Sequence, residues 1–173
     1  MKLTETRYDT RETGCCAPLD AARWNERRVT WQDKPFLRDR IRAFLHVPLN
    51  FGAVMQRDHA AIETAGAYPE EPIWLTDEVS PWGSDIYVAV DREVPGARTE
   101  RLSGTFLTKI FEGPYRDVRK WMSAMEEYVH GQGEEIEKIY FFYATCPKCA
   151  RRLGKNQVVL FAKLSGEKAA AAA

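Results

Sequence analysis

The sequence predicts an α+β fold: a tandem duplication of a strand–helix–strand–strand unit, with an antiparallel sheet, two main helices on one face and a ligand cleft. Three pairs of landmark residues share an offset of 66 positions: Pro48 and Pro114, Ile73 and Ile139, and Pro81 and Pro147. Apolar residues of the two first strands keep the same offset, since Ile41 corresponds to Leu107. A register common to strand, helix start and loop indicates one folding unit used twice, and chance agreement among common apolar residues is the alternative.

The chain before the first unit, residues 1–35, is polar and rich in arginine. It is predicted to form an arm that wraps the core. Asp20 and Asn25 are candidate caps of a short helical turn within this arm, close to Trp24.

The first unit is assigned to residues 36–97. Its strand, helix and two further strands are predicted at residues 36–46, 49–65, 73–75 and 85–90. Pro48 fits the first turn of the helix, where its missing N–H costs nothing. Gly66 suits the position just past the helix end.

The second unit is assigned to residues 98–164, and residues 165–173 form a tail. The predicted order is a strand at 105–112, a helix, a strand at 139–143, a basic loop at 146–155 and a strand at 157–164. The helix is the clearest amphipathic segment of the chain, because its apolar residues keep helical spacing: Val118, Trp121, Met122, Met125, Tyr128 and Val129.

The overall composition excludes several classes of function. Lysine plus arginine and aspartate plus glutamate each number 25, so the net charge is zero. This balance argues against direct binding to nucleic acid or to an anionic membrane. No run approaches the roughly 18 apolar residues of a membrane span, and the N-terminus lacks the apolar segment of a secretory signal. We therefore expect a cytosolic protein.

The turn from the second unit's first strand into its helix reads Phe111-Glu112-Gly113-Pro114-Tyr115. Through this turn and the duplicated order, the region Phe36–Leu164 resembles the GyrI-like (gyrase-inhibitor-like) small-molecule-binding family. The resemblance implies tandem units around a ligand cleft. It also implies a function like those of regulator ligand domains, a gyrase-inhibiting stress protein and hydrolases of reactive cyclopropane compounds. This chain departs from the family in two places. The family often has an acidic residue at the start of a second-half strand, where this chain has Asn156-Gln157. The Cys-Pro-Lys-Cys loop of this chain is not a general feature of the family and indicates a divergent branch.

Three polar residues are candidates for a site in the cleft. Glu112 ends a strand just before a helix start, where a carboxylate could bind a cationic ligand or act as a general base. His46 occupies the corresponding place in the first unit, and Asp85 begins a strand. The alternatives are a solvated carboxylate, a hydrogen-bonded structural histidine and a turn aspartate that caps backbone N–H groups.

Surplus aromatic residues supply the apolar part of the predicted site. In residues 139–143 both faces of the strand are apolar, so one face can meet the helices and the other needs a ligand, the arm or a partner. The predicted ligand-binding aromatics are Trp82, Tyr87, Tyr115, Trp121 and Tyr143. Core packing is the alternative for each of them.

The four cysteines form two close pairs, Cys15-Cys16 and Cys146-Pro147-Lys148-Cys149. Two-residue spacing lets both sulfurs of the second pair bind one tetrahedral zinc ion, and the first pair could complete the site. A redox pair is an alternative, since basic neighbours are typical of reactive thiols. Unliganded thiols are the third interpretation.

Three functions follow, in order of preference. The first is a stand-alone module that binds apolar, aromatic or cationic small molecules. The second is a hydrolase of reactive, cyclopropane-like compounds, with Glu112 activating water and Tyr115 or Tyr143 acting on the leaving group. The third is a zinc-stabilised interaction protein.

Overall fold

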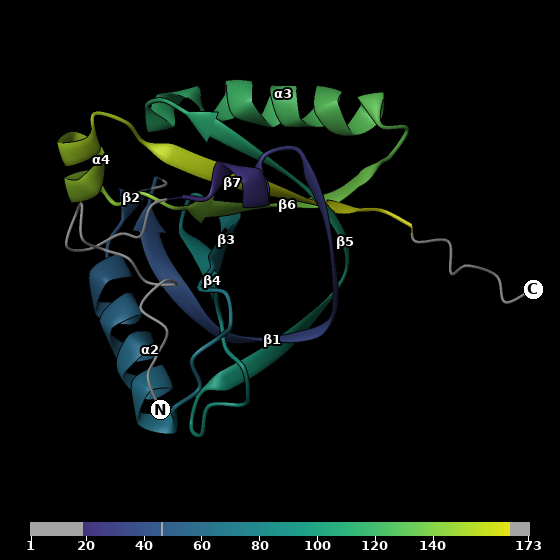
Figure 1. Ribbon diagram of the computed structural model, residues 1–173. Helices are drawn as coiled ribbons and strands as arrows, with labels where there is room; N and C mark the ends of the chain where they lie inside the picture. Colours follow the sequence, from purple (N-terminus) through teal and green to yellow (C-terminus); the bar gives the residue numbers. More distant parts are fainter. Residues whose placement is uncertain (1–18, 46, 167–173) are drawn as a thin grey trace, which may run out of the picture. The chain divides into compact units, whose positions relative to one another are not determined.

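The computed structural model describes residues 19–45 and 47–166 and has the predicted α+β fold (Figure 1). The chain divides into two compact units. We call residues 31–103 the central unit. The described residues up to Thr30, together with those from Gly104 onward, form the terminal unit.

The central unit is an antiparallel sheet with one long helix. Strand β1 enters it from the terminal unit, and the order along the chain is β1 (Arg27–Phe44), β2 (Val47–Pro48), α2 (Phe51–Ala65), β3 (Trp74–Ser80) and β4 (Gly83–Ala89). Strand β4 pairs with β1 on one side and with β3 on the other, while the short β2 pairs with the end of β1.

Alternation of apolar residues explains which sheet face meets α2. Leu37 and Ile41 of β1 point to the same face and pack with Val54 and Ile62 of the helix. Gly66 ends α2 in the left-handed conformation, with φ of 60°, as predicted. This core leaves the intervening residues of β1 and β4 on the opposite face of the sheet.

The terminal unit repeats this order of elements. It contains α1 (Ala21–Trp24), β5 (Arg98–Glu112), a 3₁₀ turn (Tyr115–Asp117), α3 (Val118–Gly131), β6 (Ile136–Tyr143), α4 (Pro147–Leu153) and β7 (Gln157–Leu164), with β5 entering from the central unit. Strand β7 pairs with β5 and β6, as β4 pairs with β1 and β3. Each unit thus has a strand, a helix and two strands in the same pairing order.

Both faces of the terminal sheet are covered by the chain itself. Helix α3 lies over one face (Figure 1), where its residues Trp121, Met125 and Val129 pack. On the other face Trp24 packs against Phe161, with ring centroids 5.1 Å apart. The Thr108 hydroxyl fixes this contact by donating a 2.7 Å hydrogen bond to the Trp24 carbonyl.

The predicted cap of α1 is confirmed. The Asp20 carboxylate accepts hydrogen bonds from the backbone N–H groups of Ala22 and Arg23, and Asn25 follows the helix as its C-cap. Residues 19–26 of the predicted arm therefore anchor the Trp24 side chain in the core of the terminal unit.

Several local predictions are wrong. Pro48 lies in β2 rather than in the first turn of α2, which follows Asn50. Residues 147–153 form the helix α4, not a loop, because Cys146 caps its start and Gly154, with φ of 69°, ends it. Strand β1 also begins at Arg27, well before Phe36, since Val29 and Trp31 alternate with exposed polar residues.

Across the described ranges, 19–45 and 47–166, the helices are too short or too polar for any of them to cross a membrane.

Candidate functional site

A hollow of about 550 Å³ lies in the central unit beside β1, α2 and the loop before β5. We call it the charged hollow, because seven charged side chains line it: Arg38, Asp39, Arg40, Arg57, Asp58, Asp85 and Arg98. Leu37, Ala61 and the loop residues 95–97 supply the less polar part of its wall.

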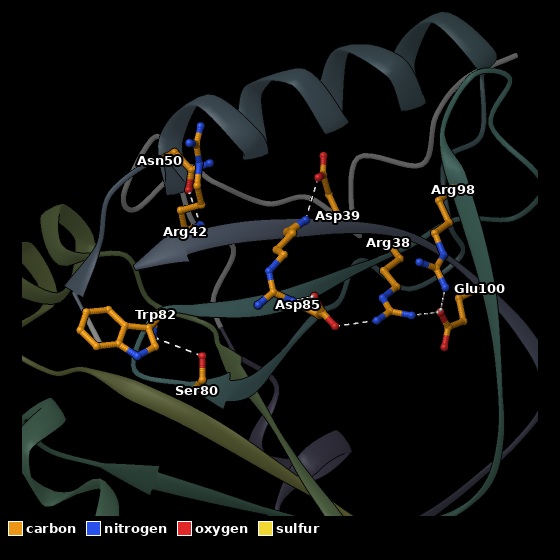
Figure 2. A network of polar contacts seen from close by, with 10 residues as sticks. Arg38, Asp39, Arg42, Asn50, Ser80, Trp82, Asp85, Arg98 and Glu100 are labelled. Carbon is orange, nitrogen blue, oxygen red and sulfur yellow. Dashed lines mark hydrogen bonds and ion pairs between the residues drawn. The ribbon is translucent and has the colours of Figure 1, made fainter. Parts of the chain in front are cut away.

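The strands place two arginines opposite one aspartate. In the β1–β4 register Arg40 faces Asp85 directly and Arg38 faces the next outward position, Tyr87. Arg38 donates to Asp85 Oδ2 at 2.6 Å (Figure 2). Arg40 donates to Asp85 Oδ1 at 3.3 Å. Both carboxylate oxygens of this buried aspartate therefore face a guanidinium group.

The network continues along the sheet to β5. Arg38 also donates to Glu100 Oε2 at 2.5 Å, and Arg98 lies 3.6 Å from the same oxygen (Figure 2). The hydrogen bonds to Asp85 and then Glu100 raise the pKa of Arg38 above its usual range. Arg38 is thus a fixed positive charge at the wall of the hollow.

A second group of charges joins β1 to α2. Asp39 accepts hydrogen bonds from the Arg57 side chain and from the backbone N–H of Arg40. Arg57 Nε also lies 3.9 Å from Asp58 Oδ1. Asp58 is only 3% exposed, and its Oδ2 atom has no hydrogen-bond partner among the residues that the structure describes.

The two carboxyl groups differ in their affinity for a proton. Burial and the neighbouring Asp39 carboxylate raise the pKa of Asp58 to about 7, against the opposing effect of Arg57. Burial also disfavours ionisation of Asp39, but the hydrogen bonds from Arg57 and the Arg40 backbone outweigh it and lower its pKa. One carboxylate and one carboxyl group that is partly protonated at neutral pH therefore line the same hollow.

Gly83 allows β1 and β4 to approach closely beside this network. A Cβ atom at Gly83 would lie 2.8 Å from the Ile41 carbonyl oxygen and 3.3 Å from Arg40 Nη2. Any other residue would move Arg40 or separate the two strands.

Three predicted ligand-binding residues lie in the central unit. Asp85 lines the charged hollow, held in the β4 strand by arginines rather than capping a turn. Tyr87 is buried, its ring packs edge-on against Phe36, and burial raises its pKa to about 12. Trp82 lies at the β3–β4 turn (Figure 2) and is 60% exposed. Its ring is next to the Phe44 ring, with centroids 5.7 Å apart.

The predicted residues of the terminal unit fall on two faces of its sheet. Tyr115 and Tyr143 are neighbours, with ring centroids 6.1 Å apart, on the α3 side. Trp121 is buried on this side and stacks on Phe111. Glu112, the next residue of the strand, points to the opposite face, where Gln157 donates to it at 3.4 Å. Glu112 and Tyr143 therefore do not meet across one surface.

Several other predicted residues cannot be placed. His46, Cys15 and Cys16 lie outside the described residues. Within the described residues no group of three metal-ligating side chains occurs, so the zinc site that needs all four cysteines stays a prediction.

The sequence reasoning missed most of the charged hollow. Only Asp85 was among the predicted site residues. A signal was present for Asp58, which stands four residues from both Val54 and Ile62 on the buried face of α2. A carboxylate at the centre of such an apolar stripe is unusual and can mark a functional group.

The sequence matches the model of the family described as Bacterial hydrolase over residues 6–164, and the chain belongs to this family. Its structure is similar to a crystal structure of a hydrolase from Listeria innocua, with a TM-score of 0.58 and 12% identity over 91% of this chain and 98% of that one. A second Listeria innocua hydrolase structure has a TM-score of 0.56 and 12% identity, over 82% of this chain and 92% of the other. No curated protein matches the chain.

Proposed function

We propose that this protein hydrolyses a small polar molecule in the charged hollow of the central unit. The observation that carries the proposal is the Asp58 side chain, which lines the hollow, is buried, and has one oxygen without a hydrogen-bond partner among the described residues. An unpartnered buried oxygen is costly unless a ligand or a proton satisfies it. Membership in a family of hydrolases supports hydrolysis as the type of reaction.

The two aspartates have the properties of a general acid and a general base. Asp58, with a pKa of about 7, can donate a proton to the leaving group. Asp39 is ionised and can accept a proton from the attacking water, while Arg57 fixes its orientation. The proton lost by Asp58 and the proton gained by Asp39 balance over one cycle.

The arginines give the hollow a preference for polar substrates. Arg40 and Arg98 are both more than half exposed at its wall, and each makes one long contact with a carboxylate. Their remaining N–H donors can bind an oxygen-rich group of the substrate. A cytosolic setting, inferred from the sequence, forms part of the same proposal.

The experiment is a hydrolysis screen with chromogenic carboxylic, phosphate and sulfate esters between pH 5 and pH 9. We expect Asp58→Asn and Asp39→Asn each to lower kcat/KM on any hydrolysed ester by about 10²-fold or more. The matched control is Asp91→Asn, which removes an aspartate whose exposed partner is Arg92 and which does not line the hollow. Activity that survives Asp58→Asn would contradict the proposal, and so would a complete lack of hydrolysis.

Binding of aromatic ligands in the terminal unit is a second candidate function. It is favoured by the Tyr115 ring, which is 44% exposed and lies against Tyr143, itself stacked 5.9 Å from Phe141. Such rings can stack on a flat ligand. Rhodamine 6G, a planar aromatic cation, should raise the melting temperature of the wild-type chain and do so less in Tyr115→Ala. An equal rise in both would exclude this site, and Glu112→Gln, which changes a side chain on the opposite face of the sheet, should leave the rise unchanged.

A further inference from the structure

The second cysteine pair lies where a strand leads into a helix. Strand β6 ends at Tyr143, and α4 begins at Pro147 with Cys146 as its N-cap residue. The Cys149 backbone N–H donates to Cys146 Sγ at 3.4 Å. The Cys146 sulfur therefore lies over the first turn of the helix, beside the residue that carries the second thiol.

The two sulfurs differ in their access to solvent. Cys146 is partly exposed, whereas Cys149 is 1% exposed. An external reagent can therefore reach Cys146 much more easily than Cys149.

Their spacing also suits a bond between them. Residues three apart at a helix start have Cβ atoms about 5–6 Å apart. A disulfide needs Cβ atoms about 4 Å apart and tolerates Cα separations of about 4.4–6.8 Å. A small adjustment of the first turn of α4 is enough to close this gap.

We propose that Cys146 and Cys149 form a thiol–disulfide exchange site, separate from the charged hollow, whose substrate is a small anionic disulfide. Cys146 attacks one sulfur of the substrate, the substrate's S–S bond breaks, and one thiol leaves with the proton from Cys146. Cys149 then attacks the Cys146 sulfur of this mixed disulfide and releases the second thiol with its own proton. Two protein thiols are oxidised to one disulfide, and the substrate disulfide is reduced to two thiols.

Charge around the site supports an anionic substrate. Lys148 lies between the two cysteines in the sequence, and Arg151 follows in the same helix. Both are exposed. Their positive charges attract a disulfide that carries carboxylates, such as glutathione disulfide.

Glutathione disulfide is the probe for the test, applied to the full chain in a Cys15→Ser, Cys16→Ser background so that only two thiols remain. The parent should lose both thiols and retain no glutathione, with an intact mass lower by two hydrogen atoms. Cys149→Ser should instead retain one glutathione on Cys146. Cys146→Ser should react about tenfold more slowly or not at all, because Cys149 is enclosed.

Three results would overturn the proposal. The first is a parent that keeps one glutathione and one free thiol. The second is Cys146→Ser reacting as fast as Cys149→Ser. The third is a parent in which both cysteines stay reduced under conditions that oxidise free cysteine. Circular dichroism melts of each variant show whether a result comes from exchange or from unfolding. Cys149→Ala provides a second variant, with a non-polar replacement, that should also retain one glutathione on Cys146.

Discussion

The two main helices bury the same pattern of positions with different chemistry. In α2 the buried residues are Val54, Asp58 and Ile62, and in α3 they are Trp121, Met125 and Val129, each set spaced four residues apart. The central position is an aspartate in one helix and a methionine in the other. The α3 core is what packing alone requires, whereas a buried aspartate such as Asp58 is expected to lower stability, as functional groups often do.

The two units also differ in the side chains on the sheet face that points away from the helix. In the terminal unit Phe161 is covered by Trp24 of the N-terminal segment. In the central unit the equivalent face carries Arg38, Arg40 and Asp85. In the terminal unit this face is therefore closed by aromatic packing, whereas in the central unit buried rings, Phe36 and Tyr87, share the face with paired charges.

The largest expected effect on stability comes from placing in α3 the aspartate that α2 has at its central buried position. Met125 is fully buried among apolar side chains. Met125→Asp should lower the free energy of unfolding by about 3–5 kcal/mol, because no arginine there compensates the buried carboxylate. Urea unfolding followed by tryptophan fluorescence measures the loss. Met122→Asp, at a half-buried position, is the control and should lower the free energy of unfolding by less. A loss below about 1 kcal/mol for Met125→Asp would show that the two cores do not differ as described.

Removing the aromatic cover of the terminal unit should have the next largest effect. Trp24→Ala empties a site that is 4% exposed and should cost about 3 kcal/mol. Asp20→Ala only removes the helix cap that precedes it and should cost about 1 kcal/mol. Equal losses in thermal or urea unfolding would mean that the cap, and not the ring, holds this segment.

Breaking the charge network tests the central unit. Asp85→Ala removes one of the two carboxylates that pair with the partly buried Arg38 and should lower stability by about 2 kcal/mol. Arg40→Ala, at an exposed side chain with a 3.3 Å contact, should cost less than about 1 kcal/mol. A double-mutant cycle with Arg38→Met measures the coupling, and a coupling near zero would contradict the described network.

The smallest expected effect is a gain in stability. Asp58→Met makes α2 resemble α3 and should raise the free energy of unfolding by about 1–2 kcal/mol at pH 8. Because the folded pKa of Asp58, about 7, exceeds its ordinary value of 3.8, the native state holds a proton that the unfolded state loses. Stability therefore falls as pH rises from about 4 to about 7, and Asp58→Met removes this fall.

The pH dependence supplies the check on this variant. The gain from Asp58→Met should be smaller at pH 5 than at pH 8, measured by urea unfolding at both values. A gain that is equal at the two pH values would show that Asp58 ionises normally. Loss of ester hydrolysis in the same variant, with higher stability, would separate the function of Asp58 from its role in folding.

Much of the fold could be predicted from local pattern. Helix α3 and strand β7 were found because their apolar residues keep the helix period or form a continuous buried run. Helix α4 was missed because a seven-residue helix has little apolar periodicity and depends on its capping residues, Cys146 and Gly154. Strand β1 began earlier than predicted because charged residues mask the alternation around Val29.

The charged hollow could be predicted only in part. The pairing of Arg40 with Asp85 depends on the register of two strands that are far apart in the sequence. The raised pKa of Asp58 depends on Asp39, which another element brings to it. Neither relation can be read from spacing alone, because tertiary packing creates both.

The terminal unit is assembled from the two ends of the described chain, and this affects how the gene can be divided. Within that unit the hydroxyl groups of Thr30 and Thr105 lie 3.2 Å apart, so the polypeptide leaves and re-enters it at neighbouring points. Expression of two fragments split near residue 97 would separate Trp24 from its binding place against Phe161. Such fragments should fold only when mixed, which makes the chain a candidate for a split reporter, whereas joining Thr30 to Gly104 through a short linker should yield the terminal unit as an autonomous miniprotein.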